Sequence, residues 1–190
     1  MRKIIYSMMV SLDGFAARPN GDLDWGLIDE EIHTFVNNQQ REIGTYLHGR
    51  KMHEVMKYWE TADQDLSSPA YELEFAKIWQ NMPKIIFSNT LEEVRGNATL
   101  FQGDIATKIG KLKQQPGKNM GVGGSTLAAT FFKLGLIDEV GLFVHPVVLG
   151  SGIPFFPALD SPLNLQLVEK RPFQSGVVYL RYQRSDLEQG

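Results

Sequence analysis

Five short segments of this sequence combine glycine or small residues with polar or cationic side chains, and each follows a predicted strand. In chain order they are Ser11–Phe15, Gly49–Lys51, Ser88–Thr90, Gly121–Leu127 and Pro146–Pro154. Loops at the carboxyl ends of strands are where α/β sheets bind ligands. The segments therefore predict a ligand site made by several loops.

The glycine-rich segment Gly121–Leu127 has the composition of an anion site. Clustered glycines let the backbone approach a ligand, and the free N–H groups at a helix start attract phosphate. The residues concerned are Gly123, Gly124, Ser125 and Thr126. Ser125 is expected to cap the following helix and to donate to the phosphate. A tight strand-to-helix turn without a ligand has the same composition, and the G-x-G-x-x-G spacing of a Rossmann site is absent.

Two cations and a hydroxyl follow other predicted strands. Gly49, Arg50 and Lys51 open a predicted helix, where the Arg50 guanidinium can hold a phosphate with two hydrogen bonds. Solvated surface cations are the alternative interpretation. Ser88 follows the predicted strand Lys84–Phe87 and is equally compatible with a simple turn.

Two carboxylates are candidate proton donors to a substrate. Asp13 lies in the loop after the first strand, and Glu30 lies in an acidic cluster at a predicted helix start. Asp13 can instead bond the backbone of its own loop, and Glu30 can stabilise the helix N-terminus. The four histidines lack metal-ligand spacing and there is no cysteine, so no metal site is predicted.

Strand and helix patterns alternate from Lys3 to Leu134, and the patterns after Val140 are strand-like. This order predicts one domain over residues 1–190 with three α/β/α layers. Its central sheet is expected to be mostly parallel with an antiparallel C-terminal edge. Asp29 and Asp104 are expected helix N-caps, and Thr90 with Glu93 matches a capping box.

The composition excludes several classes of function. A net charge of −3 gives no electrostatic basis for binding nucleic acid. No apolar run approaches the roughly 20 residues of a membrane span, and the charged residues that follow Val10 argue against a signal peptide. A chain without cysteine suits the cytoplasm. We therefore expect a cytoplasmic protein that binds a small molecule.

Taken together and in this order, the motifs resemble those of the dihydrofolate-reductase-like superfamily. The resemblance runs from Lys3 to Arg184 and is carried by Ser11–Gly14, Gly123–Leu127, Gly135–Glu139 and Pro146–Gly150. Within the superfamily, the chain is similar to the reductase domain (the C-terminal domain) of the bacterial bifunctional deaminase–reductase of riboflavin biosynthesis and to its stand-alone relatives.

The resemblance implies an NADPH-dependent reductase with a small heterocyclic or sugar-like substrate, similar to dihydrofolate reductase and 5-amino-6-(5-phosphoribosylamino)uracil reductase. It implies that Arg50 and Ser88, beside Gly49 and Lys51, hold the adenosine 2′-phosphate. The residues Gly123 to Thr126 would meet the pyrophosphate, and the Ser11–Phe15 loop would border the nicotinamide.

The resemblance also implies a homodimer, which the apolar strands Val140–Val148 and Val177–Leu180 are expected to join. Met52 and Val122 depart from the family, because they stand where relatives have a threonine and a substrate-binding glutamate. A non-catalytic NADP(H)-binding or ligand-sensing module of the same fold is therefore the alternative.

Overall fold

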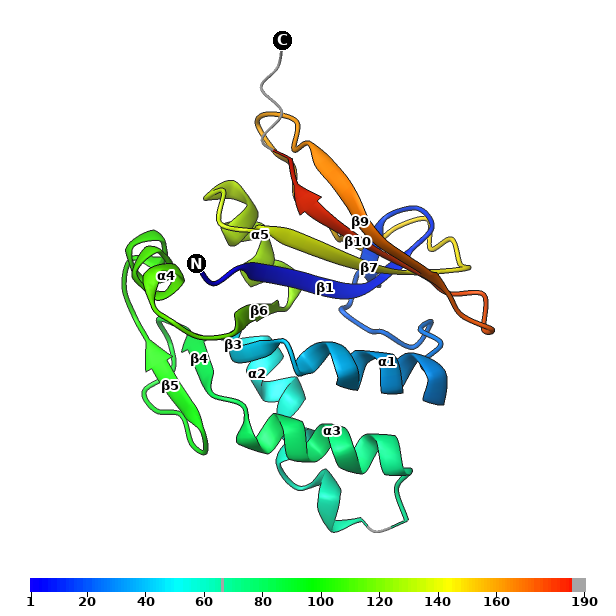
Figure 1. The fold of residues 1–190 in the computed structure, drawn as a ribbon, viewed down its shortest axis with the longest axis horizontal. Coiled ribbons are helices and arrows are strands. Elements are labelled where there is room, and N and C mark those ends of the chain that lie inside the picture. Colours follow the sequence, from blue (N-terminus) through cyan, green and yellow to red (C-terminus); the bar gives the residue numbers. More distant parts are fainter. Residues whose placement is uncertain (66, 186–190) are drawn as a thin grey trace.

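The computed structural model describes residues 1–65 and 67–185, and one large sheet organises them (Figure 1). Its strands are β1 (Ile4–Ser11), β3 (Ile43–Gly49), β4 (Lys84–Phe87), β5 (Ala98–Phe101), β6 (Asn119–Gly123), β7 (Glu139–His145), β9 (Leu165–Pro172) and β10 (Val178–Arg184). A second, two-stranded sheet joins β2 (Phe15–Ala17) to β8 (Ile153–Pro154).

The strands of the large sheet lie in the order β5-β4-β3-β6-β1-β7-β10-β9. All neighbours from β5 to β7 are parallel, whereas β10 is antiparallel to both β7 and β9. The predicted mostly parallel sheet with an antiparallel C-terminal edge is therefore confirmed. The expected boundary at residue 190 falls outside the described residues.

Helices cover both faces of the sheet. They are α1 (Glu30–Gln40), α2 (Arg50–Met56), α3 (Ala70–Asn81), α4 (Ile105–Gln114) and α5 (Ser125–Lys133), with short 3-10 helices at Lys57–Glu60 and Ala62–Gln64. Figure 1 shows α1 and α3 below the sheet and α4 and α5 on its other side. The three-layer arrangement is as predicted. Among the described residues, no helix has the length and apolar character that crossing a membrane requires.

Successive side chains of β1 pack alternately into two hydrophobic cores, one on each face of the sheet. Ile4 and Tyr6 pack with Phe131 in the core beneath α4 and α5. Ile5 points to the opposite face and packs with Trp79 of α3. Because successive strand residues face opposite sides, a strand covered on both faces must be apolar at almost every position. This explains the continuous apolar run at the start of the sequence.

Two predicted helix caps are confirmed. Asp29 Oδ1 accepts the N–H of Ile32 at 2.9 Å at the start of α1. Asp104 Oδ1 accepts the N–H of Thr107 at 2.7 Å at the start of α4. Each carboxylate thus satisfies an N–H group that the helix itself cannot pair.

Two other cap predictions are wrong. Residues 88–97 form no helix, so Thr90 and Glu93 make no capping box. Ser88 Oγ instead accepts the N–H of Thr90 at 3.2 Å, and this bond shapes a turn. Ser125 is the first residue of α5 rather than its cap; Gly124 takes the cap position, and no side chain caps the helix.

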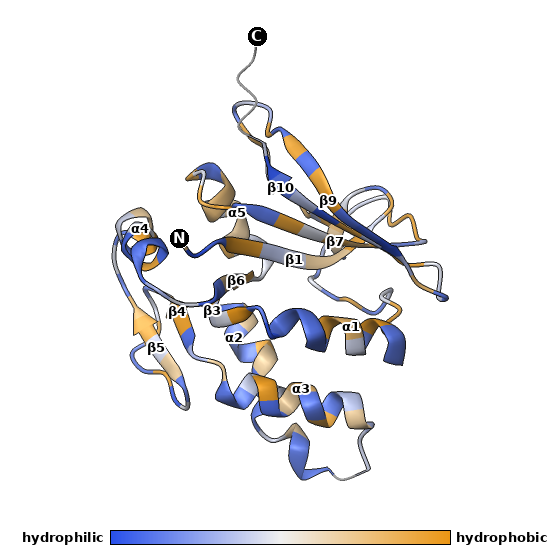
Figure 2. Ribbon diagram, in the orientation of Figure 1, coloured by the Kyte–Doolittle hydropathy of each residue, from blue (hydrophilic) through white to orange (hydrophobic). Residues whose placement is uncertain are grey.

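The strands expected to join two copies lie inside the sheet. β7 pairs with β1 and β10, and β10 pairs with β7 and β9, so neither has a free edge. The edge strand on that side is β9, where Leu167 and Val168 are 45% and 47% exposed. Figure 2 shows hydrophobic segments along β9 at this upper border of the sheet. The apolar pattern of β7 and β10 reflects burial by neighbouring strands, which local sequence cannot distinguish from a free edge.

Candidate functional site

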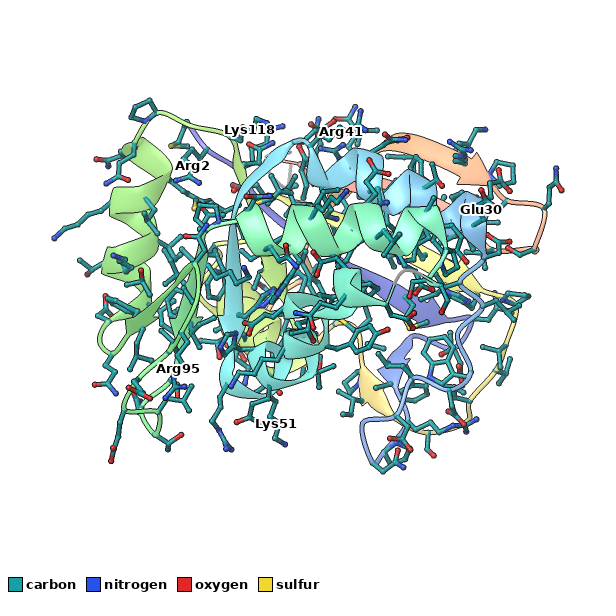
Figure 3. The ribbon with its side chains drawn as sticks, turned by 90° about the horizontal axis from the view of Figure 1, so that it is seen from below. Arg2, Glu30, Arg41, Lys51, Arg95 and Lys118 are labelled. Carbon is teal, nitrogen blue, oxygen red and sulfur yellow. The ribbon has the colours of Figure 1, made fainter. Side chains whose placement is uncertain are left out.

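The five segments singled out in the sequence meet at one edge of the sheet. β4, β3, β6, β1 and β7 are adjacent and parallel, so their carboxyl ends share that edge. Ser88 follows β4, Gly49 ends β3, Gly123 ends β6, and Asp13 follows β1. Figure 3 shows Lys51, just after β3, on the opposite side of the molecule from Arg2 and Lys118, which precede β1 and β6. The structure thus gathers segments that lie far apart in the sequence.

The start of α5 has the backbone of an anion site. Gly124 has a φ of +89°, a conformation that L-residues with a side chain rarely adopt. It turns the chain from β6 directly into α5, and no side chain in the described part of the chain caps the first N–H groups of the helix. These N–H groups and the positive end of the helix dipole are available to a phosphate. Thr126 is exposed beside them.

The two glycines before α5 also serve packing within the protein. A Cβ atom at Gly123 would lie 2.5 Å from His48 Nε2, and one at Gly124 would lie 3.2 Å from Met52 Cβ. The structure therefore requires glycine at both positions even without a ligand. Sequence reasoning considered a ligand or a tight turn, and it did not consider this approach of His48.

Arg50 and Lys51 are exposed at the start of α2. Arg50 Nη1 lies 3.6 Å from Glu54 Oε1, in an ion pair whose side chains are about half exposed. Such a pair contributes little to stability, so the guanidinium can exchange it for a phosphate at small cost. The Ser88 hydroxyl accepts two backbone N–H groups, those of Thr90 and Leu91, and lies 3.3 Å from the Thr90 hydroxyl, to which it can donate or from which it can accept.

Asp13 joins two loops of the edge. Its carboxylate accepts the N–H groups of Leu149 and Gly150 at 3.1 and 2.7 Å and the Ser11 hydroxyl at 2.6 Å. The Ser11 hydroxyl, together with these N–H groups, holds the pKa of the Asp13 carboxyl below its usual range. The side chain is therefore an ionised acceptor at neutral pH, and it fastens the loop after β7 to the loop after β1.

Glu30 lies apart from these segments. It is the exposed first residue of α1, next to the N-cap Asp29 and to Glu31, which pairs with Arg171 at 3.2 Å. Figure 3 shows Glu30 and Lys51 well separated in the view from below. The structure thus places Glu30 in the acidic first turn of a helix, where its charge favours the helix dipole.

A pocket of about 220 Å³ lies between the sheet and the layer of α1 and α3, and it reaches the carboxyl edge at Gly123. Its walls are mostly apolar or aromatic. They include Ile5, Val36, Tyr46, Met52, Met56, Phe75, Trp79 and Tyr179. A concave, largely apolar pocket with a few polar groups is the usual form of a small-molecule site.

Among the described residues that line this pocket, three buried polar atoms have no hydrogen-bond partner: Ser7 Oγ, His48 Nδ1 and Trp79 Nε1. Burial, with the charges of His53 and Lys84 nearby, lowers the pKa of His48 to about 3, so the imidazole is neutral. Sequence reasoning missed Ser7 and His48. Neither residue lies in a motif, and only the pairing of β1, β3 and β6 brings them to one face.

The sequence matches known proteins over nearly its full length. A model of the RibD C-terminal domain family matches residues 2–179. The protein YyaP of Bacillus subtilis (strain 168) is 38% identical over 184 residues, which cover 95% of this chain and 94% of YyaP.

Solved structures share the fold. A putative riboflavin biosynthesis protein from Shewanella sp. superposes with a TM-score of 0.73 at 23% identity, over 96% of this chain and 99% of that one. Dihydrofolate reductase from Enterococcus faecalis, complexed with NADP(H), superposes with a TM-score of 0.65 at 16% identity, over 97% of each chain. Because the family model matches residues 2–179 of the 190, the chain belongs to the RibD C-terminal domain family.

Proposed function

We propose that this protein is an NADPH-dependent reductase that transfers hydride to a C=N or C=O bond of a small heterocyclic or sugar-like molecule. Membership of a reductase-domain family supports an oxidoreductase. A structural neighbour that is complexed with NADP(H) supports a nicotinamide cofactor.

One observation carries the proposal: the order of the candidate groups along the carboxyl edge is the order of the parts of NADPH. Arg50 and Ser88 follow β3 and β4, the free start of α5 follows β6, and the Ser11–Phe15 loop follows β1. Along NADPH, the 2′-phosphate, the pyrophosphate and the nicotinamide follow one another in the same order. Neighbouring strands are about 4.8 Å apart, so an extended dinucleotide can cross several of them.

The residues present fit this cofactor. Arg50 and Lys51 supply positive charge for the 2′-phosphate, and Ser88 supplies a hydroxyl donor. Gly123, Gly124, Ser125 and Thr126 offer backbone N–H groups and hydroxyls to the pyrophosphate, with Gly49 at the end of β3 leaving room beside them. Bound NADPH would supply the hydride, while the protein aligns the two rings and excludes water.

Hydride addition to a C=N or C=O bond leaves a negative charge on the nitrogen or oxygen, and that atom must then take up a proton. Asp13 and Glu30 are the candidate proton donors, and they lie in different surroundings. The lowered pKa of Asp13 favours a role in which it holds the two loops in place. Glu30 lies outside the pocket, so we propose that the proton reaches the substrate from water that enters the pocket.

We further propose a homodimer in the cytoplasm, with a small-molecule substrate and no nucleic-acid or membrane partner. The absence of cysteine and the net charge of −3 support the location and the lack of a nucleic-acid partner. The exposed apolar residues of β9 support self-association.

The test is a titration of the purified protein with NADPH, NADH and 2′,5′-ADP, followed by tryptophan fluorescence. We expect NADPH to bind more tightly than NADH. Arg50→Ala should weaken NADPH binding about 10- to 100-fold, because a hydrogen bond to a charged group contributes roughly 1.5–3 kcal/mol, and it should leave NADH binding unchanged.

Arg41→Ala is the matched control. Arg41 also makes one exposed ion pair, with Glu74 at 3.1 Å, and Figure 3 shows it on the far side of the molecule from Lys51. This variant should bind both cofactors as the wild type does. A folded protein that binds neither dinucleotide would refute the cofactor assignment. Tight NADPH binding without turnover of any reducible compound would favour the non-catalytic module.

A further inference from the structure

Residues 19–27 belong to the connection between β2 and α1 and contain no helix or strand. Figure 1 shows this connection in blue, descending from beside β7 to the start of α1. Its turns are closed by hydrogen bonds within the connection itself. The N–H of Arg18 donates to the Asp22 carbonyl at 3.0 Å, and the Arg18 guanidinium pairs with Asp24 at 2.6 Å. These bonds shape the connection but do not join it to the sheet.

One hydrogen bond ties the segment to the sheet. His145, the last residue of β7, accepts the Leu27 N–H at its Nδ1 atom at 3.2 Å. Across the described part of the chain, no other hydrogen bond joins residues 19–27 to a residue beyond the connection. A backbone N–H can only donate, so His145 Nδ1 must be the unprotonated nitrogen of the ring.

The packing contacts of the segment gather at the same point. The rings of Trp25 and His145 meet edge to face, with centroids 5.4 Å apart, and the indole Nε1 finds no hydrogen-bond partner among the described residues. Gly26 lies against Met9 of β1, where a Cβ atom would collide with Met9 Cε. Leu27 itself is 52% exposed. The position of the segment therefore depends on a few contacts around His145.

The chemistry of His145 makes this attachment sensitive to acid. The side chain is 2% exposed, and burial lowers its pKa, so the imidazole is neutral near pH 7. At sufficiently low pH, Nδ1 takes up a proton and becomes a donor that faces the Leu27 N–H. The hydrogen bond is then lost, and the charged ring is buried without an acceptor. Movement of the segment away from the ring would admit water to the charge.

The elements packed against His145 bring no compensating charge to it. β1 pairs Ser11 with His145, and the turn before β10 contacts Pro146 through Gly176. Burial, rather than any neighbouring charge, lowers the pKa of His145. The tyrosines of β1 and β10 keep their protons in the acid range. The charged side chains on these elements, the connection and the start of α1 are Arg18, Asp22, Asp24, Asp29, Glu30, Glu31, Asp13 after β1, Glu139 of β7, and Arg181 and Arg184 of β10.

We propose that His145 is an acid-sensitive latch: its neutral imidazole holds residues 19–27 against the ends of β1 and β7, and its protonation releases them. The inference goes beyond the proposed function and does not depend on a cofactor. The connection leads directly into α1, whose residues Val36, Gln39 and Gln40 line the pocket. Release of the latch would therefore loosen one wall of the candidate site.

Hydrogen exchange at the Leu27 amide tests the latch. It would be measured by NMR on the full-length protein without ligand, from about pH 7 to about pH 4.5, and expressed as a protection factor, which removes the intrinsic pH dependence of exchange. We expect the protection of the Leu27 amide to fall as the pH drops below about 6.5, the ordinary pKa of histidine.

The amides of Leu149 and Gly150 provide an internal reference. They donate to the Asp13 carboxylate at 3.1 and 2.7 Å in the loop after β7. The Ser11 hydroxyl, together with these N–H groups, holds the pKa of Asp13 below its usual range, so this carboxylate stays ionised over the same pH range. Both amides should keep their protection while the Leu27 amide loses it. Parallel loss at all three amides would refute a local latch.

Two substitutions of His145 separate its acceptor from its titration. In His145→Asn, an amide oxygen can accept the Leu27 N–H and does not titrate, so protection should persist at acid pH. His145→Phe keeps an aromatic ring without an acceptor, so protection at neutral pH should be about three- to tenfold lower, as the loss of one neutral hydrogen bond implies. Thermal unfolding of each variant would establish that the fold is intact.

His53→Asn is the matched control. His53 on α2 is also 2% exposed, and burial lowers its pKa as well, but it makes no contact with the connection in any hydrogen bond or ring pair of the described chain. The same substitution at this position should leave the acid response of the Leu27 amide as in the wild type. A lost response in this variant would assign the titration to the wrong histidine.

Three results would overturn the proposal. The first is a Leu27 amide that is equally protected at both ends of the pH range in the wild type. The second is an acid response in His145→Asn that matches that of the wild type, and the third is full protection in His145→Phe at neutral pH. Because no ligand is used, these results leave the reductase proposal untouched, and a failure to bind NADPH leaves the latch untouched.

Discussion

At the scale of single residues, His48 shows how position changes the chemistry of a side chain. In water an imidazole is half protonated near pH 6.5, but burial beside Tyr46 and Trp79 lowers the pKa of His48 to about 3. The ring is thus kept as a neutral donor and acceptor. The same burial makes the residue a source of acid sensitivity.

We expect His48→Gln to lose part of that sensitivity. Below pH 6.5 the unfolded chain binds a proton at His48 that the folded protein binds only near pH 3. The contribution of His48 to the free energy of unfolding is therefore fully present above pH 6.5. It falls as the pH drops toward 3, by about 1.4 kcal/mol per pH unit. Urea unfolding at a series of pH values should show a shallower decline for the variant. Identical slopes for both proteins would contradict the assignment.

At the scale of elements, the helix starts divide into capped and open ones. Asp29 and Asp104 cap α1 and α4 with their side chains, whereas α5 begins at Gly124 without a side-chain cap. A cap satisfies the free N–H groups of a helix internally, and an open start leaves them for a ligand. The helices α2 and α3 also begin without a side-chain cap, and of these open starts those of α2 and α5 lie at the carboxyl edge, as the proposed phosphate sites require.

The two capped helices allow a matched comparison. Asp29→Ala and Asp104→Ala should each lower the free energy of unfolding by about 1 kcal/mol, because each removes one side-chain cap. Urea denaturation of each variant and of the wild type would measure the two changes. An unchanged free energy of unfolding in either variant would contradict the cap assigned to that aspartate.

At the scale of the whole molecule, the sheet leaves β9 as the edge strand beside β10. The pairing shifts register between Arg181 and Tyr182, which face Glu169 and Leu167, so Val168 falls in a bulge. Bulges at sheet edges limit uncontrolled pairing with other chains. The exposed Leu167 and Val168 nevertheless offer apolar surface to a second copy.

We expect size-exclusion chromatography with light scattering to detect a homodimer that Val168→Lys converts to a monomer. Val168 has no direct partner across the ladder, so the substitution should spare the fold. Val55→Lys makes the same change at an exposed position of α2, where Val55 is 69% exposed, and should leave the dimer intact. A wild-type protein that stays monomeric at high micromolar concentration would refute the dimer.

The sequence by itself determined the features that depend on neighbours along the chain. The alternation of strands and helices, the caps at Asp29 and Asp104, and the glycine turn into α5 arise from hydrogen bonds and backbone conformations within a few residues. The candidate cofactor residues were likewise predicted from motifs that each lie within one loop. Where two local patterns compete, as at Thr90, the sequence alone predicted a cap and the structure made a turn.

Only the tertiary structure decided which strands are neighbours and which residues share the pocket. β7 and β10 have the apolar pattern that edge or interior strands can both show, and strand order assigned them to the interior. Ser7, His48 and Gly123 come from three different strands and share the pocket because pairing sets their register. Their effect depends on burial and on unpaired hydrogen-bonding groups, which are properties of packing between distant segments and leave no signal in the local sequence.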